Sequence, residues 1–330
     1  GGLSNDMVYT TLYDRENNIW FGTFGGGLSL DLGDHIRNYT IEEGLPNNLV
    51  SSITEDREGN QWISTYGGGI SRFDSSGFQN YSVQDGLVDN KVYTAIVDDQ
   101  NRLFIGTRWG LSILDEGRFY NFDENELPYR KIRAIQQLEG AQTYWMGTYG
   151  EGVLKFEDER FDRFQEEDGL ANNTILAVEE GDDGSIWFAT YGGVSRFRDG
   201  TFTTYAIQDG LPNNGVLDIL KDREGNLWFS TYSGIAMFRE DGFMTITTED
   251  GLPDEVCYFI IQDDKGMYWI GTTMGVVRLD YDVYKGAVNE SEKEKAFKLI
   301  TQDQGLVSNE TNDGAAFKDK QRHLWFGTVG

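Results

Sequence analysis

One sequence unit of about 42 residues recurs along this 330-residue chain and restricts its possible folds more than any other feature. Each unit begins at or near a Gly-Leu pair. We expect seven complete repeats within residues 1–304, starting near residues 2, 44, 86, 126, 169, 210 and 251. Residues 305–330 hold a partial eighth repeat with only the first half of the unit. Such repeats indicate an array in which each unit buries its apolar surface against its neighbours.

The unit at 44–85 contains four short strand-like runs, named A to D, which turn residues separate. Strand A is expected at 50–55 and strand B from Trp62, with Asp56 and Gly59 in the turn between them. Asp56 can accept a hydrogen bond from the backbone two residues further on, and Gly59 can adopt positive φ. Residues that tolerate positive φ recur at this position in most repeats: Asn17, Gly59, Asn101, Gly184, Gly225 and Gly266.

Strand B opens on a large aromatic residue in every repeat, and this regular placement predicts a core position. These residues are Trp20, Trp62, Phe104, Trp145, Trp187, Trp228, Trp269 and Trp325. Four antiparallel strands per unit predict an all-β fold, a β-propeller with four-stranded antiparallel blades. Seven closed blades are favoured, because seven repeats are complete. Eight blades, with the last one incomplete, are the alternative.

Composition and charge exclude several classes of protein. The net charge of −27 is spread along the chain and repels nucleic acid. No apolar run approaches the roughly 18 residues that span a bilayer, so this domain is not expected to contact a membrane. His35 and His323 each stand alone, so we expect no metal site, catalytic triad or cofactor. Cys257 lies in an apolar strand A and is expected to be a buried, small hydrophobic residue.

The repeat resembles the two-component regulator propeller repeat of bacterial hybrid sensor kinases, whose unit reads GLPxNxVxxIxxDxxGxxWFGTxxGGLxxFD. That pattern stands nearly intact at Gly44–Asp74 and Gly210–Phe238. The resemblance implies a sensor region in the periplasm or on the extracellular face of an inner-membrane protein. It also implies an adjacent propeller or immunoglobulin-like domain in the same protein, a possible homodimer, and a kinase or other output domain elsewhere. Many relatives respond to oligosaccharides.

The strand order predicts where a ligand would bind. B–C turns and D–A connections share one face of a propeller, and propellers usually bind where such loops converge. Aromatic residues and one arginine follow strand B there, and amides lie nearby. We expect ligand contacts from Tyr66, Arg108, Trp109, Tyr149, Tyr191 and Tyr232. Sugar rings could stack on the aromatic faces, and Arg108 could pair with an acidic sugar such as a uronate. In the alternative, the tyrosines pack between blades and the asparagines shape turns.

Three functions are compatible with these sequence features. The first is a non-catalytic, ligand-sensing propeller of a two-component sensor that binds a carbohydrate or another small extracellular ligand. The alternatives are a structural or protein-interaction propeller and a propeller hydrolase or lyase. The charged insertion at 281–296, between strands C and D of repeat seven, is expected to be a solvated loop on the face opposite the proposed site.

Overall fold

The computed structural model describes residues 5, 8–16, 18–31, 36–123, 127, 131–239, 242–263, 265–301, 310–318 and 324–328. The chain divides into two compact units, Gly1–Arg163 and Phe164–Gly330. The same element recurs in both, an antiparallel sheet of four strands in chain order. We number these sheets as blades 1 to 7 along the chain and keep the names A to D for the strands of each.

Blades 1 to 4 belong to unit 1, whose boundary falls in the last strand of blade 4. Blade 1 consists of β1 (Val8–Tyr13), β2 (Ile19–Thr23), β3 (Leu28–Asp31) and β4 (Ile36–Tyr39). Blade 2 consists of β5 (Val50–Glu55), β6 (Gln61–Thr65), β7 (Gly69–Asp74) and β8 (Gly77–Tyr81). Blade 3 consists of β9 (Val92–Val97), β10 (Leu103–Thr107), β11 (Gly110–Asp115) and β12 (Arg118–Phe122). Blade 4 consists of β13 (Ile132–Gln137), β14 (Tyr144–Thr148), β15 (Val153–Glu157) and β16 (Arg160–Phe164).

Blades 5 to 7 belong to unit 2. Blade 5 consists of β17 (Ile175–Glu180), β18 (Ile186–Thr190), β19 (Gly193–Arg198) and β20 (Thr201–Tyr205). Blade 6 consists of β21 (Val216–Lys221), β22 (Leu227–Thr231), β23 (Gly234–Arg239) and β24 (Gly242–Ile246). Blade 7 consists of β25 (Cys257–Gln262), β26 (Tyr268–Thr272), β27 (Val276–Leu279) and β28 (Phe297–Ile300). A two-stranded sheet follows, β29 (Thr311–Lys318) paired with β30 (Leu324–Thr328), and β29 lies beside β25.

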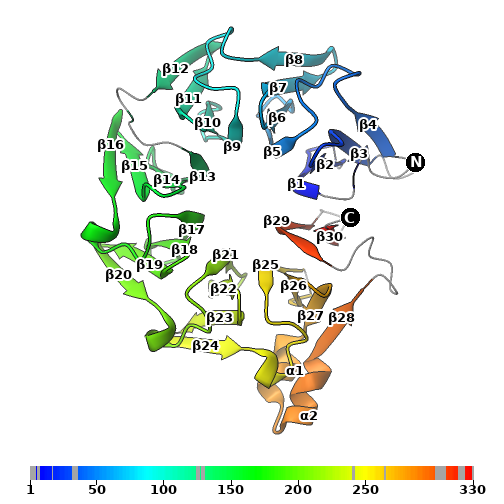
Figure 1. Cartoon of the computed structure of the whole chain (residues 1–330), viewed down its shortest axis with the longest axis vertical. Helices are drawn as coiled ribbons and strands as arrows, with labels where there is room; N and C mark the ends of the chain where they lie inside the picture. Colours follow the sequence, from blue (N-terminus) through cyan, green and yellow to red (C-terminus); the bar gives the residue numbers. More distant parts are fainter. Residues whose placement is uncertain are drawn as a thin grey trace. The chain divides into compact units, whose positions relative to one another are not determined.

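The predicted fold is confirmed: the chain is a β-propeller with seven four-stranded antiparallel blades, and nearly all its regular structure is sheet. Within unit 1 the A strands of successive blades lie side by side, and the D strands lie farthest from them (Figure 1). Single turns of 3-10 helix occupy three D–A connections of unit 2: η1 (Glu166–Asp168), η2 (Ile207–Asp209) and η3 (Thr248–Asp250).

The B strands form the core of the blades, as the aromatic pattern predicts. Every residue of strand B is buried in blades 1 to 6. The opening aromatic residues of these strands are at most 6% exposed. Trp269 of blade 7 is half-buried. The side chain of Trp325 lies outside the described residues.

The A–B turns are held by an aspartate that also binds the core. Asp56 accepts hydrogen bonds from the backbone N–H groups of Glu58, at 3.0 Å, and Asn60, at 2.9 Å. Its second carboxylate oxygen accepts the indole N–H of Trp62 at 2.9 Å. The same aspartate-to-tryptophan bond occurs in three other blades, at Asp14, Asp222 and Asp263. The turn therefore fixes the rotamer of the central core residue, a link that was not predicted from the sequence.

The predicted positive φ in the A–B turn is confirmed at Gly59, Asn101, Gly184, Gly225 and Gly266. Asn17 lies outside the described residues. The first residue of strand C in blade 2 must also be glycine. Gly69 has a φ of +88°, and a Cβ there would lie 2.1 Å from the backbone carbonyl oxygen of Tyr81. The start of strand C thus packs directly on the end of strand D, and this keeps the B–C turn short.

The insertion in blade 7 departs from the expectation of a solvated loop. It contains α1 (Tyr281–Gly286), α2 (Glu290–Lys293) and η4 (Glu294–Ala296), between strands β27 and β28. Tyr284 and Ala296 are buried, and the Tyr281 ring lies 5.1 Å from that of Trp228 in blade 6. Lys293 pairs with Asp250 at 2.8 Å. Aromatic packing against the neighbouring blade therefore orders this charged segment.

Candidate aromatic and cationic binding surface

The B–C turns lie against the D–A connections within unit 1, as expected from the strand order. The backbone N–H of Tyr66 donates to the carbonyl of Leu49, the residue just before strand A of the same blade, at 2.9 Å. The N–H groups of Arg108 and Tyr149 donate to the carbonyls of Lys91 and Lys131 in the same way. Each predicted turn residue therefore sits beside the start of strand A.

The predicted aromatic residues are all partly open to solvent. Tyr66, Trp109 and Tyr149 in unit 1, and Tyr191 and Tyr232 in unit 2, are between 37% and 43% exposed. They stand next to B strands that are buried throughout. Aromatic residues at such positions expose a ring face that packing inside the blades does not require.

A β-bulge near the start of each strand A presents a further side chain to this surface. The pairing of β9 with β10 skips Tyr93, and the pairing of β13 with β14 skips Arg133. A bulged residue is left out of the ladder, and bulges often redirect a side chain beside a functional site. The bulge residues of blades 5 and 6 are the apolar Leu176 and Leu217.

Cations and tyrosine rings alternate across blades 2 to 4. The Lys91 ammonium lies 3.8 Å from the ring centroid of Tyr66, and the Tyr66 and Tyr93 rings are 5.5 Å apart. The Arg133 guanidinium lies 5.6 Å from the Tyr93 ring and 5.7 Å from that of Tyr149. The Lys131 ammonium lies 5.1 Å from the Tyr149 ring. We call Tyr66, Lys91, Tyr93, Lys131, Arg133 and Tyr149 the cation–aromatic surface.

The environment of this surface shifts the pKa values of Tyr66 and Tyr93 in opposite directions. Lys91 is the main cause that holds the pKa of Tyr66 below its ordinary value. Burial, followed by the hydrogen bond with Tyr66, raises the pKa of Tyr93 to about 12. Among the described residues, no carboxylate lies within ion-pair distance of Lys91, Lys131 or Arg133. Within the described residues, the positive charge of these three cations is therefore not offset by an ion pair.

Arg108 has a protein partner, which sets it apart from these three cations. Its guanidinium donates to the carboxylate of Asp89 at 3.1 Å, and Asp89 is 5% exposed. It also lies 5.1 Å from the ring of Trp109. An external anion at Arg108 would have to compete with a buried carboxylate. Arg108 therefore fits a positioning role for the turn better than the anion-binding role suggested by the sequence.

The nearby asparagines shape the connections, because their side-chain carbonyl oxygens accept backbone N–H groups. Asn47 accepts the backbone N–H of Leu49 at 2.8 Å, and Asn48 accepts that of Ile41 at 2.9 Å. The pattern repeats in unit 2 at Asn172, Asn173, Asn213 and Asn214. These bonds agree with the alternative in which the asparagines shape turns.

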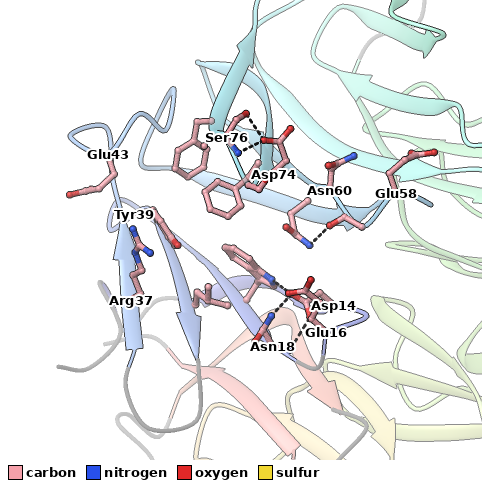
Figure 2. A pocket seen from close by; sticks show the side chains of 18 residues that line it. Asp14, Glu16, Asn18, Arg37, Tyr39, Glu43, Glu58, Asn60, Asp74 and Ser76 are labelled. Atoms are coloured by element: carbon pink, nitrogen blue, oxygen red, sulfur yellow. Dashed lines mark hydrogen bonds between the residues drawn. The ribbon is translucent and has the colours of Figure 1, made fainter.

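A separate groove lies elsewhere in unit 1, between the A–B and C–D turns of blades 1 and 2 (Figure 2). Its volume is ≈ 930 Å³, and carboxylates outnumber cations in its lining. Asp14 and Asp74 are bound to their own turns, by Asn18 and Ser76. A groove of ≈ 460 Å³ occupies the matching place between blades 5 and 6. Such grooves follow from sheets that diverge outward, so they do not single out a binding site.

Four residues of this surface, Lys91, Tyr93, Lys131 and Arg133, were not predicted from the sequence. The sequence does contain a signal for the two lysines. The residue directly before strand A is lysine in blades 3 and 4, whereas in other blades it is Leu49, Thr174, Gly215 or Val256. Basic residues at one repeat position are conspicuous in a chain with a net charge of −27. The β-bulge that brings Tyr93 and Arg133 to the surface has no distinctive residue pattern in the sequence.

The remaining predictions concern the cysteine, the histidines, metal binding and membrane spans. Cys257 is fully buried, and burial raises the pKa of its thiol, which confirms its role as a small core residue. His35 and His323 lie outside the described residues. Within the described ranges, no three side chains of the metal-binding types come together. None of the helices in that part of the chain is both long and apolar enough to cross a membrane.

Comparison with solved structures supports the fold. The extracellular domain of BT3049 from B. thetaiotaomicron, a chain assigned to a hybrid two component system, matches with a TM-score of 0.67 and 23% identity. The match covers 96% of this chain and 43% of that domain, so this chain spans less than half of it. Virginiamycin B lyase from Staphylococcus aureus matches with a TM-score of 0.60 and 15% identity, over 80% of this chain and 91% of the lyase. At these identities the similarity concerns the fold alone.

The sequence repeats also match a family model. The family model described as "Two component regulator propeller" matches residues 2–25, 44–67, 169–192 and 210–233. No match was found among curated proteins. The matched segments contain strands A and B of blades 1, 2, 5 and 6. Four segments of the chain therefore match the two-component regulator propeller repeat.

Proposed function

We propose that this chain is the ligand-binding sensor part of a bacterial two-component system and that it acts outside the cytoplasm. Its ligand is a carbohydrate or another small extracellular molecule, and the domain does not transform it. The match of four repeats to the two-component regulator propeller model supports a sensory role. The fold of an extracellular domain from a two component system supports the location.

The observation that carries the ligand class is the row of exposed rings on the cation–aromatic surface. Tyr66 and Tyr149 are 37% and 42% exposed, beside strands that are buried. Stacking on the apolar face of a sugar ring is a favourable use of such a surface, because it removes apolar area from water without a deep pocket. A bound ligand would select one arrangement of this domain relative to its partner, an adjacent domain or a second copy of the chain.

Tyr149→Ala is expected to weaken binding of the cognate oligosaccharide about tenfold, the loss of one aromatic stacking contact of about 1.4 kcal/mol. Isothermal titration calorimetry against plant and host tetrasaccharides measures this. Tyr120→Ala is the matched control, because Tyr120 is 51% exposed on the outer strand β12. If Tyr149→Ala and Tyr66→Ala both bind like the native chain, the ligand site lies on another surface.

The absence of catalysis is tested separately. We expect every tetrasaccharide that binds to be recovered with unchanged length and mass after prolonged incubation, because binding here uses ring stacking and charge without an activated nucleophile. High-resolution chromatography with mass detection provides the measurement. Product formation that a single substitution in the chain abolishes would establish an enzyme and contradict this part of the proposal.

A further inference from the structure

We propose that the cation–aromatic surface selects short saccharides that carry an anionic group, a carboxylate or a sulfate, on a sugar ring. This inference rests on the proposed function and narrows its ligand class. The argument begins with the three cations Lys91, Lys131 and Arg133, which lie on one surface of an otherwise acidic chain.

These cations contact aromatic rings and not carboxylates. In the part of the chain that the structure describes, each has aromatic contacts and none has an ion-pair partner. A cation over an aromatic ring at an exposed site is held only weakly. By contrast, Arg108 in the B–C turn and Arg102 in the A–B turn of blade 3 each pair with a buried aspartate, Asp89 and Asp98. The three remaining cations therefore keep their capacity to bind an external anion.

The position of Arg133 suits an oxyanion in particular. Its guanidinium lies between the rings of Tyr93 and Tyr149, at 5.6 and 5.7 Å, and its side chain is exposed. A guanidinium that contacts rings can still donate N–H groups from its edge, and this fork matches a carboxylate or a sulfate. A sugar that stacks on Tyr149 would place its ring substituents near Arg133 and Lys131.

The net charge restricts the length of such a ligand. A chain with a net charge of −27 repels a long polyanion along most of its surface. A tetrasaccharide with a few charges contacts only the cationic area, because salt screens charges beyond about 8 Å at physiological ionic strength. Short acidic saccharides therefore fit this surface, whereas nucleic acid and acidic polymers do not.

The test uses probes that differ only in charge. Tetragalacturonate is compared with its fully methyl-esterified form, and a sulfated carrageenan tetrasaccharide with its desulfated form, by calorimetry. We expect the native chain to bind at least one acidic probe about tenfold or more tightly than its neutral form. The pair that shows the preference tells carboxylate from sulfate.

The variants separate charge from stacking. Arg133→Gln should remove most of the preference, with about a tenfold loss for the acidic probe and little change for the neutral one. Lys91→Gln and Lys131→Gln should each reduce it less, and Arg133→Lys should restore part of it. Arg118→Gln, an exposed cation on β12, is the matched control and should bind like the native chain. Circular dichroism and thermal midpoints establish that each variant is folded.

Each other outcome overturns the inference in a distinguishable way. Equal binding of acidic and neutral probes, both weakened by Tyr149→Ala, would leave the proposed function standing and refute the selection for anions. No binding of any probe, together with Arg133-dependent binding of a decaglutamate peptide, would assign the surface to an acidic protein segment and refute both proposals. Binding of acidic probes that Arg133→Gln leaves unchanged would place the anion site elsewhere.

Discussion

Trp187→Ala is expected to lower the free energy of unfolding by about 3–5 kcal/mol, the range for truncation of a large buried aromatic residue. Trp187 is 2% exposed. Its ring lies 4.7 Å from that of Phe238 and 5.7 Å from that of Phe229, both in blade 6. Its indole N–H donates to Ser185 at 2.8 Å. The substitution opens a cavity between blades 5 and 6 and removes the partner of a buried hydroxyl.

Urea unfolding followed by tryptophan fluorescence and by circular dichroism measures this loss. Tyr191→Ala in the same blade is the control, since Tyr191 is 43% exposed, and it should change stability by no more than about 0.5 kcal/mol. A loss below about 1 kcal/mol for Trp187→Ala would mean that strand B does not form the core.

Asp222→Asn is expected to lower the free energy of unfolding by about 3 kcal/mol, because it breaks a buried hydrogen-bonded network that joins two blades. Asp222 accepts the indole N–H of Trp228 at 2.8 Å and the hydroxyl of Tyr268, from blade 7, at 2.7 Å. It also accepts the backbone N–H and side-chain amide of Asn226. An asparagine would turn an N–H group toward these donors. Asp199→Asn, an exposed position, is the control and should be nearly neutral.

The same network predicts a dependence on pH. Burial alone would raise the pKa of Asp222, but the hydrogen bonds from Asn226, Tyr268 and Trp228 outweigh it and lower the pKa. A lowered pKa in the folded state stabilises the protein above the unfolded value of about 3.9, and this contribution is lost as the pH falls through the folded value. The difference in unfolding free energy between native and Asp222→Asn should be constant from pH 5 to 8, by this linkage, and shrink below about pH 4. A difference that grows on acidification would contradict this assignment.

The blades could be predicted from sequence because their determinants are local. The Asp56–Gly59 turn, the Trp at the start of strand B and the alternation of short strands all lie within one repeat. The cross-blade bonds could not be predicted in this way. Asp222 and Tyr268, like Asp98 and Tyr144, are 46 residues apart in sequence. They meet only once neighbouring sheets have packed.

The candidate site was only partly predictable for a related reason. The exposure of Tyr66 and Tyr149 follows from the strand order, which fixes the position of the B–C turns. The partnership of Arg108 with Asp89 depends on the conformation of the D–A connection, and the contribution of Arg133 depends on a bulge. Similarly, the packing of Tyr281 on Trp228 orders an insertion whose composition suggests a solvated loop.

The central claim is that the cation–aromatic surface is the ligand-binding surface of this domain. Hydrogen–deuterium exchange with mass spectrometry, with and without the saccharide that binds most tightly in calorimetry, tests it most directly. We predict that the ligand slows exchange at residues 66–69, 91–93, 108–110, 131–133 and 149–152. Protection confined to residues 14–18, 58–61 and 74–78, which border the groove in Figure 2, would contradict the claim.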